Sequence, residues 1–327
     1  MFYGARLRAL LRQPWDLVHV WQEPFTLAAA QVAALLPRKT PLVFATFQNI
    51  TKRYPPPFGW LERFVLRRSC GWIAFGQTTR ATLSARKEYA IRPHAVIPPG
   101  VDCALFKADA AMRETTLRKL GWTSDGPPVV GFVGRFVPEK GGRFLADVLD
   151  RLTIPWRALW VGHGPEQSFL TNWAAKYNDR VRIVVDASHN EVPEYLNAMD
   201  LLAAPSQTTP KWREQFGRML AEAMACSVPV VASNSGEIPH VIEGAGVALA
   251  EADGNTWVEM LSLLLTNPTR RAELAEKGRA RALEHFDWKV VAAQHLSFFG
   301  RLLGIASAIE IGSAAEAERS RSIAELL

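Results

Sequence analysis

Short apolar runs alternate with longer amphipathic stretches along most of the chain. Four runs lie at residues 17–21, 42–46, 71–75 and 95–98, and six follow at residues 129–134, 158–161, 181–185, 201–204, 228–232 and 247–250. Strands of a parallel sheet with helices on both faces read as uninterrupted apolar runs of this kind. The pattern therefore predicts an α/β protein with two parallel sheets.

A polar helical stretch at residues 109–120 and a turn-rich loop at residues 123–128 separate the two sets of strands. We expect a first domain over residues 1–108, a second over residues 109–287, and a crossing helix with a tail over residues 288–327, frayed after about residue 313. The second domain has enough βα units for a complete doubly wound, Rossmann-like fold. The first has about four such units, so we expect it to be incomplete.

Composition supports two globular domains and narrows the class of partner. The 327 residues are 48% hydrophobic and 21% charged, which excludes a disordered chain. The net charge of +6 favours contact with a nucleotide, an acidic membrane surface or nucleic acid. A mildly basic enzyme with no polyanionic partner is the alternative, because the chain has no run of five basic residues, and nucleic acid is not expected. Three scattered cysteines predict neither disulfides nor a zinc site, so we expect a reducing cytoplasm.

A glycine and two cations follow the first strand of the second domain. Gly134 and Arg135 come directly after the strand, and Lys140 lies a few residues further on. Open α/β sheets bind ligands at the carboxyl ends of their strands, and glycine lets the backbone approach a ligand there. An arginine fork and a lysine point charge together can neutralise a diphosphate. A solvated loop with two surface cations is the alternative.

Two further turns follow later strands. Gly162 and Gly164 leave room for a nucleotide at the sheet edge, although an ordinary βα turn explains them as well. The turn at residues 236–239 is expected to be structural.

The segment from Ser206 to Glu222 carries the strongest signal. The chain leaves a strand at Ser206, crosses a polar loop that contains Glu214, and is predicted to enter a helix near Gly217. The free N–H groups of a helix N-terminus suit phosphate, and two carboxylates can accept hydrogen bonds from the hydroxyls of a sugar and a ribose. The alternative is a pair of surface glutamates on an amphipathic helix, but the small and apolar neighbours of Glu222 argue against it.

In order and spacing, these motifs resemble the retaining glycosyltransferases of family 4, also called glycosyl transferases group 1. The resemblance covers about residues 98–286, with landmarks at residues 97–102, 134–141, 193–200, 205–206, 214–222 and 229–232. It implies the GT-B fold, in which two Rossmann-like domains face a cleft.

The resemblance also implies a role for each motif residue. Arg135 and Lys140 would hold the donor diphosphate and stabilise it as it leaves, and Glu214 would contact the donor sugar; these three are the implied catalytic residues. Transfer is expected to be a front-face attack with retention, needing no side-chain base, metal or other cofactor. Donor binding is implied for Gly134, Gly162, Gly164, Ser206, Phe216, Gly217, Arg218, Met219 and, through the ribose, Glu222.

The first half of the chain departs from the family pattern. Gln48 stands where the family often has a histidine near the donor sugar, so the side chain can form hydrogen bonds but cannot titrate. Glu23 lies in a loop that resembles the acceptor side, and a plain surface loop is the alternative. The family usually has several βα units before residue 17, so we expect a fragment, a misassigned start, or a shortened relative with reduced or no activity.

The expected function is transfer of a sugar from a nucleotide-sugar donor to a glycan, lipid or small-molecule acceptor. Such an enzyme would serve cell-envelope glycan synthesis in the cytoplasm, with peripheral contact at the inner face of the membrane. A non-catalytic nucleotide-sugar-binding or partner subunit is the main alternative, and a nucleotide-sugar epimerase with the same fold is a weaker one. The sequence does not predict the base, the sugar or the acceptor.

Overall fold

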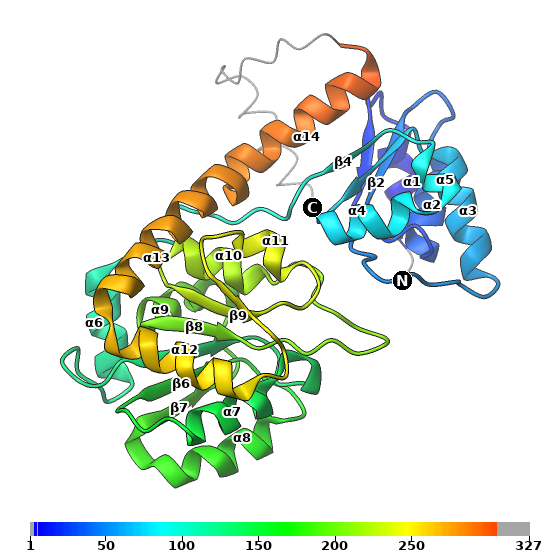
Figure 1. Cartoon of the computed structure of the whole chain (residues 1–327). Coiled ribbons are helices and arrows are strands. Elements are labelled where there is room, and N and C mark those ends of the chain that lie inside the picture. Colours follow the sequence, from blue (N-terminus) through cyan, green and yellow to red (C-terminus); the bar gives the residue numbers. More distant parts are fainter. Residues whose placement is uncertain (1–2, 5, 306–327) are drawn as a thin grey trace.

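The computed structural model describes residues 3–4 and 6–305, which form two α/β domains (Figure 1). The first domain is a parallel sheet with the strand order β1-β2-β3-β4. Its strands and helices are α1 (Arg6–Leu11), β1 (Val18–Val20), α2 (Leu27–Leu35), β2 (Leu42–Thr46), α3 (Phe58–Arg68), β3 (Gly71–Ala74), α4 (Gln77–Ser84), α5 (Lys87–Ala90) and β4 (His94–Val96).

The second domain is a parallel sheet of six strands in the doubly wound order β10-β9-β8-β5-β6-β7. Its elements are α6 (Ala110–Lys119), β5 (Val129–Val133), α7 (Gly142–Asp150), β6 (Arg157–Val161), α8 (Gln167–Ala174), β7 (Val181–Val184), α9 (Val192–Asn197), β8 (Leu201–Ala204), α10 (Arg218–Ala225), β9 (Val230–Ser233), α11 (Ile238–Ile242), β10 (Val247–Leu249), α12 (Gly254–Thr266) and α13 (Pro268–Arg281). The predicted fold class is confirmed, and the observed strand ends differ from the predicted ones by at most two residues.

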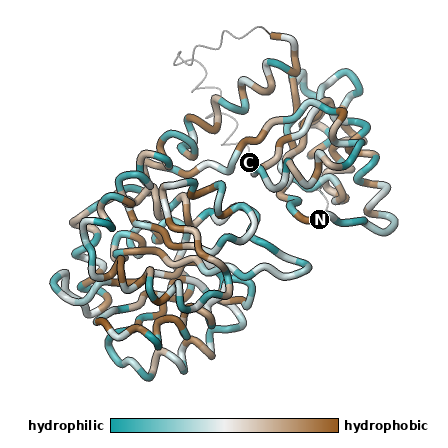
Figure 2. Tube along the Cα trace, in the orientation of Figure 1, coloured by the Kyte–Doolittle hydropathy of each residue, from teal (hydrophilic) through white to brown (hydrophobic). Residues whose placement is uncertain are grey.

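Each sheet is buried on both faces, which explains why its strands read as uninterrupted apolar runs. Successive residues of β5 point to opposite faces, so Val129 packs into one core of the second domain and Val130 into the other. In Figure 2 the hydrophobic segments of this domain gather in its interior strands. None of the helices in the described part of the chain is long and apolar enough to cross a bilayer.

The chain passes between the domains twice, and the two passages lie side by side. The Val101 N–H donates to the carbonyl of Phe286 at 2.7 Å, and the Trp288 N–H donates to the carbonyl of Val101 at 3.2 Å. A side chain at Gly100 would collide with the Trp288 ring, so glycine allows this close crossing. Val101 already packs into one of the two cores of the second domain. The predicted domain boundary near residue 108 stays a prediction.

After the second passage, helix α14 (Trp288–Leu303) returns to the first domain (Figure 1). Its Val291 and Phe298 pack with Val43 of β2 and Ile73 of β3, so the helix supplies one face of the first domain's core. The predicted tail after about residue 313 lies outside the described residues.

Glu237 makes a further contact between the domains. It precedes α11 in the second domain, and its carboxylate accepts hydrogen bonds from the backbone N–H groups of Gln77 and Thr78 at 2.7 and 2.8 Å. These N–H groups open helix α4 of the first domain, where a carboxylate also interacts favourably with the helix dipole. A Cβ at Gly76 would occupy the position of the carboxylate. The turn at residues 236–239 thus ties the two domains together.

Candidate functional site

Three glycines shape the carboxyl edge of the second sheet where β5 and β6 end. Gly134 has a φ of 148°, which a residue with a side chain rarely adopts, and a Cβ there would face open space. A Cβ at Gly162 would strike the Gly134 carbonyl, and one at Gly164 would strike the backbone of Phe136. Gly162 and Gly164 therefore let the two loops pack together, while Gly134 leaves space at the edge itself.

The two predicted phosphate-binding cations lie in different surroundings. Arg135 is exposed, and its side chain forms no hydrogen bond or ion pair with any other described residue. Lys140 ends the 3₁₀ turn Pro138–Lys140, and its Nζ lies 2.5 Å from Oε2 of Glu214. The Ser206 hydroxyl donates to the same oxygen at 2.8 Å. The structure thus brings Lys140, Ser206 and Glu214 together, with side-chain exposures of only 14% for Lys140 and 7% for Glu214.

The backbone of Glu214 is held by both domains. Its carbonyl accepts hydrogen bonds from the Asn49 side chain of the first domain at 2.8 Å and from the Glu237 N–H at 3.0 Å. Gly236 has a φ of 56° and passes so close that a Cβ would overlap the Glu214 carbonyl. Because the main chain is fixed at these points, the Glu214 side chain is held at the edge of the sheet.

Helix α10 begins directly after this segment and presents a free N-terminus. Gly217 precedes it in the left-handed conformation, with φ 78° and ψ 63°, and no side chain caps the helix. Its first N–H groups are therefore open to a ligand. The Phe216 ring is buried edge-on against Phe286, so only its backbone faces the site. Arg218 is exposed, whereas Met219 is buried in the core.

Glu222 lies further along α10 and is buried, with 5% of its surface exposed. Its Oε1 is 4.0 Å from Nδ1 of His189, and no described residue donates a hydrogen bond to the carboxylate. Burial raises the pKa of Glu222 to about 7, and Arg218 opposes this shift. The carboxyl group is therefore only partly ionised near neutral pH.

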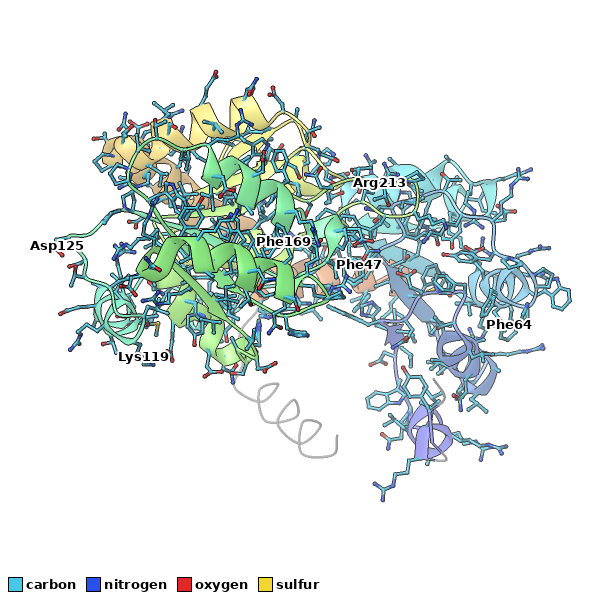
Figure 3. The ribbon with its side chains drawn as sticks, turned by 90° about the horizontal axis from the view of Figure 1, so that it is seen from below. Phe47, Phe64, Lys119, Asp125, Phe169 and Arg213 are labelled. Atoms are coloured by element: carbon cyan, nitrogen blue, oxygen red, sulfur yellow. The ribbon has the colours of Figure 1, made fainter. Side chains whose placement is uncertain are left out.

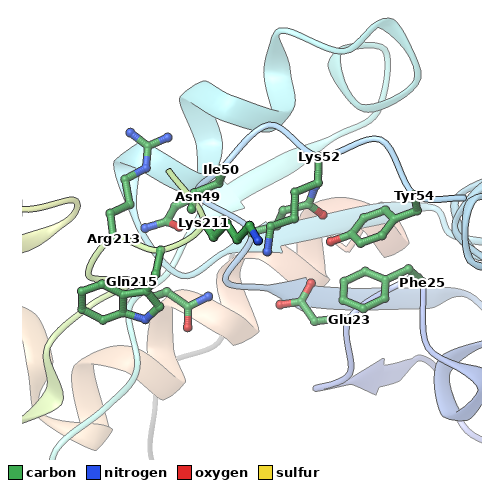
Figure 4. A pocket seen from close by; sticks show the side chains of 11 residues that line it. Glu23, Phe25, Asn49, Ile50, Lys52, Tyr54, Lys211, Arg213 and Gln215 are labelled. Atoms are coloured by element: carbon green, nitrogen blue, oxygen red, sulfur yellow. The ribbon is translucent and has the colours of Figure 1, made fainter. Parts of the chain in front are cut away.

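On the side of the first domain, loops that follow β1 and β2 face the Glu214 segment across a cavity of about 160 Å³ (Figure 4). Gln48 lies in its wall, is only 6% exposed, and has no partner for either amide atom among the described residues. Glu23 also contributes to the wall; its carboxylate accepts from the Thr46 hydroxyl at 2.5 Å and the Phe47 N–H at 2.8 Å. Burial raises the pKa of Glu23. Both predicted first-domain candidates therefore line the space between the domains.

Several residues of this region were not predicted from local sequence patterns. Asn49, which holds the Glu214 backbone, was not predicted. The turn that contains Glu237 was expected to be structural, but its contact with helix α4 was not predicted. Trp212, in the polar loop before Glu214, was not predicted either; the Lys140 ammonium lies over its ring, 5.4 Å from the ring centroid. Trp212 stands between Lys211 and Arg213, directly before Glu214, and this pattern could have marked the loop as part of the site. The contacts of Asn49 and Glu237 join residues more than 150 positions apart, so local patterns could not reveal them.

Removal of the Lys140 charge should destabilise the protein, because it leaves the Glu214 carboxylate buried without its cation. We expect Lys140→Met to lower the free energy of unfolding by about 3 kcal/mol, and the double variant with Glu214→Gln to lose less than the sum of the two single variants. Urea unfolding followed by circular dichroism measures both effects.

Lys119→Met provides the control, because Lys119 pairs with Glu194 on the surface, where an ion pair contributes little. Equal destabilisation by Lys119→Met and Lys140→Met would contradict the expected importance of the buried pair. Strict additivity of Lys140→Met and Glu214→Gln would contradict their direct interaction.

Comparison with known proteins places the chain in a family. Residues 113–281 match the family described as "Glycosyl transferases group 1", and residues 1–105 match "Glycosyltransferase Family 4". The 2-deoxystreptamine glucosyltransferase of Streptomyces kanamyceticus is 27% identical over 311 residues, which cover 90% of this chain and 79% of that protein.

Two further similarities concern a second bacterial relative and a solved structure. The GDP-mannose-dependent monoacylated alpha-(1-6)-phosphatidylinositol monomannoside mannosyltransferase of Corynebacterium glutamicum is 31% identical over 202 residues, 60% of this chain and 53% of that protein. The crystal structure of Anabaena Alr3699/HepE in complex with UDP superposes with a TM-score of 0.74 at 20% identity, covering 90% of this chain and 82% of that one. The chain therefore belongs to the glycosyl transferases group 1 family, and it is a glycosyltransferase with the GT-B fold.

Proposed function

We propose that this glycosyltransferase moves a sugar, with retention, from a nucleoside-diphosphate sugar at the edge of the second sheet to an acceptor on the side of the first domain. One observation carries the proposal: Lys140, Ser206 and Glu214 converge at the carboxyl edge of the sheet and face the other domain. The UDP complex of the structural neighbour and the GDP-mannose dependence of the bacterial relative support the class of donor.

In the proposed reaction, the donor diphosphate lies between Lys140, Arg135 and the free N-terminus of α10. The bond between the anomeric carbon and the phosphate oxygen breaks, and the diphosphate leaves with the electron pair. The acceptor hydroxyl attacks from the same face, and its proton passes to the departing phosphate. The cations and the helix end stabilise the charge that develops on the leaving group, and we propose that no metal or other cofactor takes part.

The two glutamates have separate proposed tasks. Oε2 of Glu214 is occupied by Lys140 and Ser206, while no described residue donates to Oε1, so this oxygen is placed to accept a hydrogen bond from a donor-sugar hydroxyl. Glu222, further along α10, is proposed to accept hydrogen bonds from the ribose. Glu214 therefore acts on the sugar, and Glu222 acts on the nucleotide.

Glu214→Ala tests the proposed role of Glu214 in transfer. We expect donor hydrolysis and transfer to fall about 100-fold, because the variant loses a sugar contact and frees Lys140 from its position. Turnover is measured with a panel of UDP- and GDP-sugars, and Glu194→Ala on the surface serves as the control. Equal rates for the wild type and Glu214→Ala would remove Glu214 from the site. Donor binding without turnover by the wild type would favour a non-catalytic nucleotide-sugar-binding subunit.

The pKa of Glu222 predicts a pH dependence of donor binding. The ionised carboxylate is the better acceptor for ribose hydroxyls, so affinity should be highest above pH 7 and should fall by up to about tenfold per unit below it. The diphosphate of a nucleotide sugar does not titrate between pH 6 and 8. Isothermal titration at pH 6, 7 and 8 should show this slope in the wild type and its loss in Glu222→Gln. An unchanged slope in Glu222→Gln would argue against the ribose contact.

We further propose that the enzyme works in the cytoplasm, at the inner face of the membrane. Helix α3 supports this location, because its exposed side carries Phe58, Trp60 and Phe64 beside Arg63 and Arg67. Trp60 is 62% exposed, and Figure 3 shows Phe64 on the outer side of the first domain. Aromatic residues flanked by arginines suit an anionic lipid surface. The bacterial relative named above has a phosphatidylinositol mannoside in its name, which agrees with a lipid acceptor.

The double variant Trp60→Ser/Phe64→Ser tests this surface. We expect its binding to vesicles of phosphatidylglycerol and phosphatidylcholine to fall at least about tenfold in a sedimentation assay, because two buried aromatic contacts with the bilayer are lost. Leu263→Ser, on an exposed position of α12 in the second domain, provides the matched control. Unchanged vesicle binding by the double variant would exclude α3 as the membrane-facing surface.

A further inference from the structure

The cavity between the domains carries an unbalanced positive charge. It is bounded by loops of the first domain that follow β1 and β2 and by residues 211–215 of the second. Lys52 reaches it from the first domain, and Lys211 and Arg213 reach it from the second. In Figure 4 the ammonium ends of Lys52 and Lys211 point toward each other across this space, and Figure 3 shows the Arg213 loop reaching the first domain. Both lysines are exposed, and an anion between two facing ammonium groups would interact favourably with each of them.

The described protein does not neutralise these cations. Lys52, Lys211 and Arg213 take part in none of the ion pairs formed within residues 3–4 and 6–305. Glu23 is the one acidic residue in the wall, and its carboxylate is already engaged by Thr46 and Phe47. Burial raises the pKa of Glu23, and the charge of Lys52 opposes this rise. This one carboxylate faces three cations in the wall. The cavity therefore keeps a positive charge.

Several polar groups in the wall have no partner within the described part of the chain. Both amide atoms of the buried Gln48 are unpaired, and so is the buried Nε of Arg213. Buried polar groups are normally hydrogen-bonded, so groups left open in a cavity indicate a polar ligand. Gln48 offers both a donor and an acceptor, and Arg213 offers a donor with a positive charge.

The rest of the wall suits a ring. Phe25 and Tyr54 stack with ring centroids 4.2 Å apart and form an apolar wall of the cavity. Opposite them lies the loop that contains Glu214, where Gln215 donates to the Phe47 carbonyl at 3.1 Å. The cavity thus adjoins the proposed donor-sugar position on the side of the first domain, from which the acceptor would approach.

We propose that this cavity binds an anionic acceptor, a sugar or cyclitol that carries a phosphate or carboxylate, with the anion between the ammonium groups of Lys52 and Lys211. The Arg213 guanidinium points away from these ammonium groups in Figure 4 and adds positive charge at the rim of the cavity. The ring lies against Phe25 and Tyr54, and Gln48 hydrogen-bonds to its hydroxyls. The assignment of this ligand to the acceptor rests on the function proposed above. Lys52, Lys211 and Arg213 are then specificity-determining residues that select charged over neutral acceptors.

Direct binding tests this proposal without requiring transfer. Glucose 6-phosphate, glucuronate and glucose are titrated calorimetrically into the wild type, Lys52→Gln/Lys211→Gln, Arg213→Gln and the control Lys277→Gln, which removes an exposed charge of α13. We expect the two anionic probes to bind the wild type and the control about tenfold more tightly than glucose does. The preference should disappear in the double variant, shrink in Arg213→Gln, and weaken with added sodium chloride in the wild type.

Nucleotide-sugar binding by the same variants separates this proposal from the proposed function. Unchanged affinity of Lys52→Gln/Lys211→Gln for nucleotide sugars, together with lost affinity for glucose 6-phosphate, supports the anionic acceptor site. Equal affinity of the wild type for glucose 6-phosphate, glucuronate and glucose overturns the proposal, whether or not nucleotide sugars bind. Failure of every nucleotide sugar to bind the wild type contradicts the proposed function instead, and the acceptor assignment falls with it.

The donor is the other source of a carboxylate in this region. If the wild type prefers UDP-glucuronate to UDP-glucose, and the double variant loses that preference, the cations recognise the donor sugar and the acceptor proposal is overturned. Equal affinity of both donors for the wild type, with a lysine-dependent preference for glucose 6-phosphate over glucose, supports the anionic acceptor.

Discussion

The Glu214 carbonyl oxygen accepts hydrogen bonds from both domains, and the arrangement of the site depends on this junction. Asn49 donates from the first domain, and the Glu237 N–H donates from the turn whose carboxylate holds helix α4. The backbone of the segment is therefore fixed before any ligand binds. Because the side chain of Glu214 is also bound by Lys140 and Ser206, few rotamers remain open to it. A site held in this way needs little reorganisation when a donor binds.

The same junction couples the donor side to the acceptor side. The loop that supplies Lys211, Trp212 and Arg213 leads directly into Glu214, and Lys140 lies over the Trp212 ring. An anion that draws Lys52 and Lys211 together would act on the loop that positions the glutamate. The crossing at Val101 and Trp288, with α14 completing the core of the first domain, limits how far the domains can separate. Ligands on either side of the cavity would therefore act on the same loop, which runs from Lys211 to Glu214.

Burial divides the charges of the site into two kinds. Lys140 and Glu214 are mostly buried and paired, so the loss of either one would leave the charge of the other buried without a partner. Arg135, Lys52 and Lys211 are exposed, and their charge is available to a ligand. Glu222 lies between these cases, since it is buried without a hydrogen-bond donor among the described residues and its pKa is raised to about 7. Unpaired positive charge thus lies at the two places where we propose that anionic groups bind, the site of the donor diphosphate and the cavity of the acceptor.

Local patterns in the sequence determined the fold class, because the central strands of each sheet are buried on both faces and so read as apolar runs. They also indicated the motif residues, because the glycines at strand ends and the spacing of Glu214 and Glu222 can be recognised within short stretches of the sequence. The tertiary structure alone showed that Gly162 and Gly164 allow two loops to pack, that the Phe216 ring is buried against Phe286, and that Asn49 and Glu237 join the domains. It alone gathered Lys52, Lys211 and Arg213 around one cavity. These facts depend on contacts between residues far apart in the chain, which local hydrophobic periodicity and residue spacing do not encode.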